Sequence, residues 1–235
     1  MRNREKYMPI LEHVQELKER VLIIVLVFFI SSSVCIIYAN EISLILQKPA
    51  LGIKFLQLGP GEYLGVSIKI SLYLSLFINS PFILYQILRF TLPGLTREES
   101  KYVIPTAIGS LCLFCIGGIF SYTTLVPITL KFLSDYGSDI VEPVWSFSEY
   151  FNFISMTIIT TGFCFQIPII QIILGVTNIV QWKVMLKNWK YIIFGTTIIS
   201  ALITPSTDPI TQVFTTSTLL LLYFSGVLIL KIVKN

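Results

Sequence analysis

Residues Tyr150 to Trp182 read YFNFISMTIITTGFCFQIPIIQIILGVTNIVQW and contain no charged side chain over 33 positions. A second uncharged stretch, Tyr102 to Leu130, covers 29 positions. The hydrocarbon core of a bilayer is ~30 Å thick, and a helix of roughly 20 apolar residues crosses it with its backbone groups satisfied internally. The chain is 54% hydrophobic, and its mean hydropathy is +0.79. These features predict membrane-spanning helices.

Further uncharged windows divide the rest of the chain in the same way. We expect one all-α, polytopic membrane domain over residues 1–235, with six transmembrane helices at about 21–39, 66–89, 102–131, 150–177, 191–204 and 209–230. The first apolar run is longer than the core of a signal peptide, so we expect it to remain as an anchor. The fifth span has 14 residues, or about 21 Å of helix, which predicts a thinner bilayer around it or an off-centre helix.

The basic residues are distributed asymmetrically. With six spans, both termini lie on one side, and that side carries thirteen Lys and Arg residues against three on the other. Basic residues are retained on the side from which a chain inserts, so we expect both termini to be cytoplasmic or stromal. The net charge of +4 therefore reflects topology and gives no indication of nucleic-acid binding.

The sequence offers few groups for catalysis or cofactor binding. All four cysteines lie in apolar runs, and Cys112 and Cys115 have the spacing of half a zinc or redox motif without a second pair. His13 is the single histidine, and the chain has no glycine-rich phosphate loop. We therefore predict no cofactor, no metal site and no enzymatic activity.

Two other classes of membrane protein fit the hydrophobicity. A secondary solute transporter typically has paired intramembrane charges, interrupted helices or inverted repeats, and the two longest runs here contain no charge. A scaffolding subunit of an energy-transducing complex gives no reason for acidic residues among the basic flanks. Both classes remain alternatives.

Two motifs on the basic side and the turn between the last two spans carry a resemblance to a known family. They read His13-Val-Gln-Glu-Leu-Lys-Glu-Arg20, Phe90-Thr-Leu-Pro-Gly-Leu-Thr-Arg-Glu-Glu99 and Thr204-Pro-Ser-Thr-Asp-Pro-Ile-Thr-Gln212. With Glu62 and Lys69 flanking the second span, and Tyr122 to Pro127 ending the third, this ordered set resembles TatC. TatC is the multispanning core of the twin-arginine protein translocase, which is Sec-independent.

The resemblance implies a receptor in which Glu16 and Glu99 bind the arginine pair of a signal peptide. A planar guanidinium binds a carboxylate bidentately and a Lys ammonium cannot, so two carboxylates can select two arginines. Two such contacts are too weak alone, so the apolar stretch of the signal must insert beside the first spans. The other residues that we assign to signal binding by resemblance are Lys18, Arg20, Phe90, Pro93, Leu95 and Arg97.

Each carboxylate also has a purely structural interpretation. Glu16 precedes Arg20 by four residues, the favourable order for a helical ion pair. Glu99 follows Thr96 by three residues, the spacing of a capping box. Lys18 stands where the family usually has Arg.

Two polar residues fall inside the predicted spans. Lys69 lies near the start of the second span, so its side chain can reach the membrane surface opposite the termini. The resemblance permits a pairing with Glu62. Gln166 lies deep in the fourth span beside Pro168, where we expect an interhelical hydrogen bond. An amide does not titrate, so Gln166 itself cannot relay protons.

The turn between the last two spans has two interpretations. Its prolines and Asp208 favour a tight turn, and in the first interpretation Thr204 and Gln212 only satisfy the hydrogen bonds of this turn. The resemblance implies instead that Thr204, Pro205, Asp208 and Gln212 contact single-span TatA/TatB-type partner subunits. It also implies a homo-oligomer within a larger complex, which exports folded proteins with energy from the proton gradient. Gln166 and the turn sequence resemble the plastid and cyanobacterial type, which predicts a thylakoid membrane, with a bacterial inner membrane as the alternative.

Overall fold

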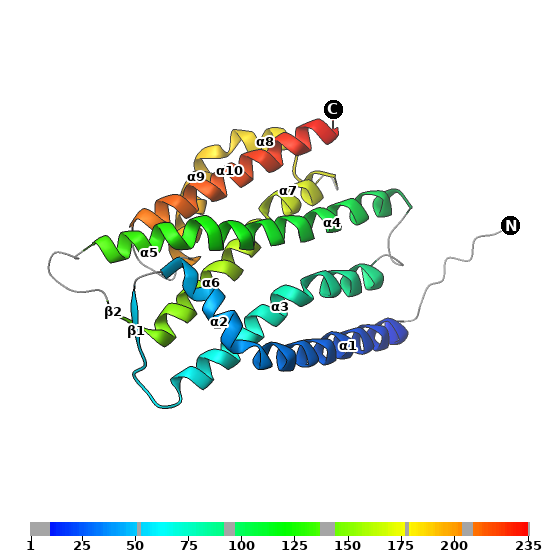
Figure 1. Ribbon diagram of the computed structural model, residues 1–235. Coiled ribbons are helices and arrows are strands. Elements are labelled where there is room, and N and C mark those ends of the chain that lie inside the picture. The colour runs from blue at the N-terminus through cyan, green and yellow to red at the C-terminus, as the bar shows by residue number, and fades with distance from the viewer. Residues whose placement is uncertain are drawn as a thin grey trace.

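The computed structural model describes residues 10–50, 53–91, 97–136, 144–176, 179–203 and 209–234, most of which are helical (Figure 1). The α-helices are α1 (Ile10–Ile37), α2 (Ala39–Gln47), α3 (Glu62–Thr91), α4 (Arg97–Phe120), α5 (Val126–Asp135), α6 (Phe147–Cys164), α7 (Ile167–Val176), α8 (Trp182–Lys187), α9 (Trp189–Ile203) and α10 (Pro209–Lys234). The other elements are the 3₁₀-helix η1 (Lys48–Ala50), the π-helical turn η3 (Ser121–Leu125), and strands β1 (Lys54–Leu56) and β2 (Val144–Ser146).

A helix lies at each of the six predicted spans. Within the described ranges, five helical stretches are long and apolar enough to cross a membrane: Val14–Ile37, Glu62–Ile87, Ile104–Asp135, Phe147–Val176 and Pro209–Ile232. The fifth predicted span corresponds to α9, which has 15 residues and a length of roughly 22 Å. The short span is therefore present as expected.

The third span is longer than predicted. We expected Tyr122 to Pro127 to form the last part of this span, which was to end near residue 131. Instead α4, η3 and α5 form one continuous helical rod that ends at Asp135 (Figure 1). Pro127 has no N–H to donate to the preceding turn, and the π-helical turn just before it accommodates that missing bond. The proline alters the helix without terminating it.

The fourth span is broken at Phe165 and Gln166, between α6 and α7. Pro168 stands in the first turn of α7, and its ring would clash with the carbonyl four residues earlier, that of Cys164. The chain therefore leaves the helix for two residues and resumes it. At the break the N–H groups of Phe165 and Gln166 still donate, to the Thr161 and Phe163 carbonyls, each at 3.0 Å.

Five short elements were not predicted, namely α2, η1, β1, β2 and α8. The strands pair in parallel, with Lys54 opposite Val144 and Leu56 opposite Ser146, and so join the segments that precede α3 and α6. Each strand has three residues, too few for a periodic signal in the sequence. The fold remains all-α apart from this small sheet.

The helix ends gather at two ends of the bundle (Figure 1). We call the end where α1 and α4 begin and where α3 and α10 finish the basic end. The opposite end, where α3, α6 and α10 begin, is called the acidic end. At the basic end the Lys183 and Lys231 ammonium groups lie 5.7 and 5.5 Å from the Trp182 ring centre. Such amphipathic aromatic and basic pairs are typical of a membrane interface.

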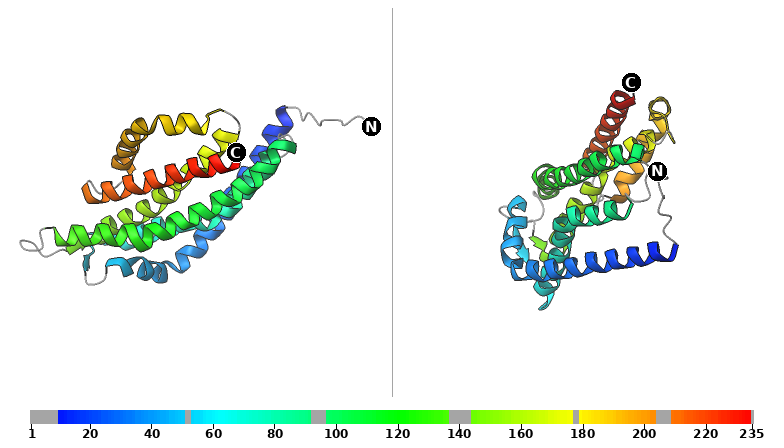
Figure 2. Two further views of the ribbon diagram at one scale, coloured as in Figure 1. Left: turned by 90° about the horizontal axis from the view of Figure 1, so that it is seen from above. Right: turned by 90° about the vertical axis from the view of Figure 1, so that its right-hand side faces the viewer.

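Helix α1 lies at one margin of the bundle, and α8 and α9 lie at the other (Figure 2). Most large apolar side chains of α1 are exposed, as is typical of a helix that faces lipid. Asn79 on α3 donates a hydrogen bond of 2.5 Å to the Ser31 hydroxyl and so holds α1 in register. The central core is formed by side chains such as Ile70, Val126 and Ile154 on α3, α5 and α6.

Candidate functional site

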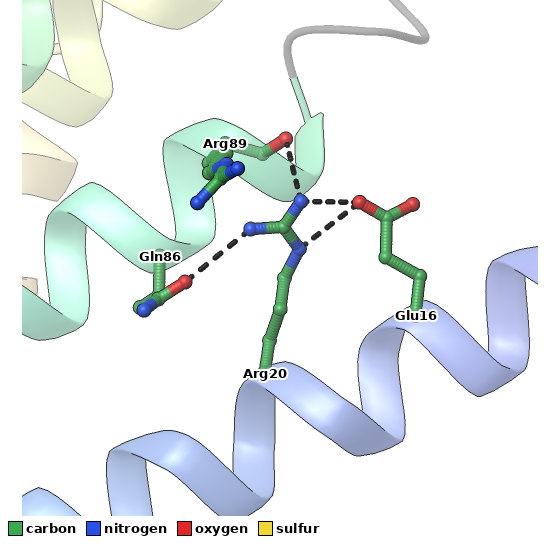
Figure 3. A network of polar contacts seen from close by, with 4 residues as sticks. All are labelled: Glu16, Arg20, Gln86 and Arg89. Carbon is green, nitrogen blue, oxygen red and sulfur yellow. Dashed lines mark hydrogen bonds and ion pairs between the residues drawn. The ribbon is translucent and has the colours of Figure 1, made fainter.

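Arg20 on α1 connects this helix to the last turns of α3 at the basic end (Figure 3). Its Nε donates a hydrogen bond of 3.1 Å to Glu16 Oε1, and its Nη2 donates to the same oxygen. Nη1 donates to Gln86 Oε1 at 3.3 Å, and Nη2 donates to the Arg89 carbonyl at 3.4 Å. We call Glu16, Arg20, Gln86 and the Arg89 carbonyl the Arg20 cluster.

The Arg20 cluster follows from local helix geometry. Residues four apart share one face of a helix, which brings Glu16 and Arg20 together. The Arg89 carbonyl lies in the final turn of α3, where carbonyls have no intrahelical partner and the helix dipole favours a cation. Gln86 is buried. The Glu16 and Arg20 side chains keep 25% and 14% of their exposure, so an incoming group can reach the carboxylate.

The cluster presents a carboxylate that can change partner. An ion pair between residues four apart contributes only about 0.3–0.5 kcal/mol when it is exposed to water. Arg20 also has neutral partners in Gln86 and the Arg89 carbonyl, so it keeps hydrogen bonds if a second cation engages Glu16. The arrangement can therefore bind a guanidinium from outside.

The other residues predicted to bind a signal lie near this cluster or outside the described part of the chain. Lys18 on α1 is exposed, and Phe90 in the last turn of α3 is half-buried. The backbones of Arg97 and Glu99 lie in the first turn of α4, at the same end of the bundle, but their side chains lie outside the described part. Pro93 and Leu95 also lie outside the described residues.

Of the structural alternatives for the two carboxylates, one is confirmed and the other remains a prediction. The predicted ion pair between Glu16 and Arg20 is confirmed. Glu99 is the third residue of α4, the position that a capping box requires, although Thr96 lies outside the described residues. The capping alternative for Glu99 therefore stays a prediction.

Of the predicted partner-contact residues, the structure describes Gln212, near the start of α10 at the acidic end. Thr204, Pro205 and Asp208 lie outside the described residues. Gln212 is half-buried in α10, and its carbonyl accepts a hydrogen bond of 3.0 Å from the Ser200 hydroxyl on α9. This bond fixes the two helices that flank the turn.

Gln166 makes the interhelical hydrogen bonds predicted for it. Its Nε2 donates to the Ser110 carbonyl at 3.1 Å, and its Oε1 accepts from the Ser110 hydroxyl. Both bonds reach α4 from the break between α6 and α7. The amide therefore joins the broken fourth span to the third span by two hydrogen bonds.

The permitted pairing of Lys69 with Glu62 is wrong. Lys69 donates instead to Asn152 Oδ1 on α6, at 3.3 Å. Glu62 accepts bonds from the backbone N–H groups of Leu58, Gly59 and Ser148 at 2.6, 3.2 and 2.8 Å, and one from the Ser146 hydroxyl at 3.2 Å. Because these donors surround the carboxylate, it faces the start of α6 and not Lys69.

Sequence reasoning missed the roles of Gln86 and Asn152. The signal that identifies Gln86 is a glutamine in the final turns of an apolar helix, three residues before the basic residue Arg89. Asn152 lies 83 residues from Lys69 in the chain, and no local pattern connects the two.

Comparison with known proteins identifies the family of this chain. The family model described as Sec-independent protein translocase protein (TatC) matches residues 12–217. The chain belongs to the TatC family. It is 53% identical to an uncharacterized tatC-like protein, ycf43, of Gracilaria tenuistipitata var. liui, over 97% of this chain and 96% of that protein.

Two further TatC proteins resemble the chain over nearly its whole length. The Sec-independent protein translocase protein TatC of Synechocystis is 43% identical, over 94% of this chain and 87% of that one. The crystal structure of the twin arginine translocase receptor TatC superposes with a TM-score of 0.80 and 32% identity, covering 95% of this chain and all of that one.

Membership of the TatC family decides between the classes left open by the sequence. The chain is a component of a Sec-independent protein translocase of the plastid and cyanobacterial type, and not a solute transporter or a scaffold. TatC proteins act in transport together with other subunits. Chloroplast and cyanobacterial relatives, together with the apolar helices, make it a multi-pass protein of the thylakoid or plastid membrane.

Proposed function

We propose that this chain is the receptor that binds twin-arginine signal peptides at the basic end of the bundle. The observation that carries the proposal is the partly exposed Glu16 carboxylate, which Arg20 holds between the first turns of α1 and the last turns of α3. One arginine of the signal binds Glu16 in competition with Arg20, and the second binds Glu99 on α4, which begins at the same end of the bundle. Lys18, Phe90, Pro93, Leu95 and Arg97 form the rim that orients the peptide.

The arginine pair supplies selectivity, and the apolar part of the signal supplies most of the affinity. A hydrogen bond to a charged group contributes about 1.5–3 kcal/mol, whereas a micromolar complex needs about 8.2 kcal/mol. The exposed apolar face of α1 runs from the Arg20 cluster into the membrane. It offers the apolar stretch of the signal a surface directly beside the carboxylate.

The same proposal covers assembly at the acidic end. Thr204, Pro205, Asp208 and Gln212 contact single-span TatA/TatB-type subunits next to the short helix α9. Several copies of the chain join in one complex that exports folded proteins at the expense of the proton gradient. The short α9 thins the bilayer locally, which favours passage of the cargo there.

The test is crosslinking to a twin-arginine precursor in membranes. A capping box accepts Gln as well as Glu, so Glu99→Gln keeps the helix and removes the charge. We expect normal accumulation of this variant and loss of precursor crosslinks; crosslinks at the wild-type yield would remove Glu99 from the site. Gln212→Leu is expected to lose crosslinks to partner subunits and keep those to the precursor.

A further inference from the structure

An apolar cavity of about 270 Å³ lies between α2, α3, α4, η3 and α6, towards the acidic end. Its walls include Ile42 and Ile45 from α2, Tyr73 and Phe77 from α3, and Ile159 from α6. The Tyr122 hydroxyl donates to the Ile45 carbonyl at 2.6 Å and holds α2 across the cavity. The Arg20 cluster at the basic end takes no part in it.

The size and lining of the cavity restrict what can occupy it. Pockets that hold a drug-sized molecule measure roughly 300–1,000 Å³, so this cavity of about 270 Å³ is slightly smaller than such pockets. It accommodates a flexible alkyl chain and not a helix, whose diameter with side chains is about 10–12 Å. Apart from the α2 residues, its walls lie in helices that are long and apolar enough to cross a membrane, so the surrounding medium there is lipid.

A cation lies one helical turn from the cavity, on the side of the acidic end. Lys69 precedes the cavity residue Tyr73 by four positions on α3, and Asn152 precedes Ser155 by three on α6. Residues at these spacings are neighbours on a helix surface. Lys69 is exposed and donates to Asn152 Oδ1 at 3.3 Å, so the two side chains meet between the helices above the cavity.

The Lys69 ammonium suits an anionic headgroup. An ammonium carries three hydrogen-bond donors, and the bond to Asn152 takes one of them. The nearest carboxylate in sequence, Glu62, is held by four donors at the start of α6 and is turned away. A long Lys side chain within a span reaches the interface, where lipid headgroups lie.

We propose that the cavity and Lys69 together form a binding site for one anionic membrane lipid. The headgroup lies against the Lys69 ammonium and the Asn152 amide, and one acyl chain fills the cavity beneath α2. The bound chain replaces the contacts that an empty cavity lacks and so stabilises the packing of α2 on α3 and α6. The site is independent of signal-peptide binding.

The test is native mass spectrometry of the purified full chain after incubation with equal amounts of phosphatidylglycerol and phosphatidylcholine. We expect one retained lipid, with phosphatidylglycerol preferred about tenfold. Lys69→Gln is expected to abolish the preference, and Lys69→Arg to keep it. Lys131→Gln, which removes another exposed lysine of the acidic end, is the matched control and keeps the preference.

The acyl-chain part of the site is tested separately. Leu74→Trp and Ile159→Phe each fill the cavity, and both are expected to lose retained lipid of either kind. Wild-type thermal midpoints in detergent are expected to rise more with phosphatidylglycerol than with phosphatidylcholine. A preference that survives in Lys69→Gln, or lipid retention that survives in both filled variants, would overturn the proposal.

Discussion

Gln86 on α3 accepts a hydrogen bond from Arg20 on α1 at 3.3 Å, and it is the one buried side chain among the described partners of this guanidinium. The bond crosses between two helices at the basic end. It fixes the direction in which Arg20 holds Glu16. The orientation of the Glu16 carboxylate therefore depends on a buried side chain of α3.

Replacement of Gln86 by Leu should weaken both the packing of α1 and the binding of signal peptides. A hydrogen bond to a charged group contributes about 1.5–3 kcal/mol, and Arg20 loses its bond to the buried amide. We expect a lower thermal midpoint in detergent and a weaker complex with a twin-arginine peptide. Ser80→Ala, which removes a bond within α3 only, is the control. Equal peptide affinity in Gln86→Leu and the control would contradict the positioning role.

Replacement of Glu62 by Ala should destabilise the acidic end. The Glu62 carboxylate accepts the N–H of Ser148 in the first turn of α6, so it caps a helix other than its own. Loss of a helix cap typically costs about 0.5–2 kcal/mol. The measurement is the thermal midpoint, with Glu19→Ala on the exposed face of α1 as the control. Equal thermal midpoints for Glu62→Ala and Glu19→Ala would contradict this capping role.

Gly226 on α10 should not tolerate a side chain. A Cβ at this position would lie 1.9 Å from Gln171 Oε1 and 2.8 Å from the Pro168 Cα, a backbone atom that cannot move aside. Overpacking of this kind typically costs about 1–3 kcal/mol. We expect Gly226→Ala to lower the thermal midpoint, whereas Gly195→Ala, which has no neighbour within 4 Å, leaves it unchanged or raises it. A wild-type midpoint for Gly226→Ala would show that α7 and α10 are not so closely packed.

Gln166 and Ser110 should be energetically coupled. Gln166→Leu removes its hydrogen bonds with Ser110, and Ser110→Ala removes one of them. Interhelical hydrogen bonds in membranes contribute about 0.6 kcal/mol on average. A double-mutant cycle is expected to give a coupling of about that size between the two substitutions. Strict additivity would argue against the bond.

The transmembrane helices could be predicted from the sequence because charge and hydropathy decide them. An uncharged run such as Tyr150 to Trp182 has no stable alternative to a helix in lipid. The length of the third span could not be predicted, since it depends on how a π-helical turn accommodates Pro127. The strands β1 and β2 are too short for a periodic pattern and form only because α3 and α6 lie side by side.

The candidate site was predictable only in part, for a similar reason. The Glu16–Arg20 pair follows from spacing along one helix, and it is present. The contact of Arg20 with Gln86 and that of Lys69 with Asn152 depend on how helices rotate against one another, which spacing does not encode. Glu62 had an obvious charged neighbour in the sequence, but three backbone N–H groups hold it more strongly than a lysine seven residues away.

The most direct test compares the affinity of the purified chain in lipid nanodiscs for a twin-arginine signal peptide and for its lysine-pair variant. Because a carboxylate binds a guanidinium fork and an ammonium differently, we predict at least tenfold tighter binding of the arginine form, or about 1.4 kcal/mol. Glu16→Gln is predicted to abolish most of this preference, and the helix content of the variant is predicted to equal that of the wild-type chain. Equal affinity of the wild-type chain for both peptides, or an undiminished preference in Glu16→Gln, would contradict the receptor proposal.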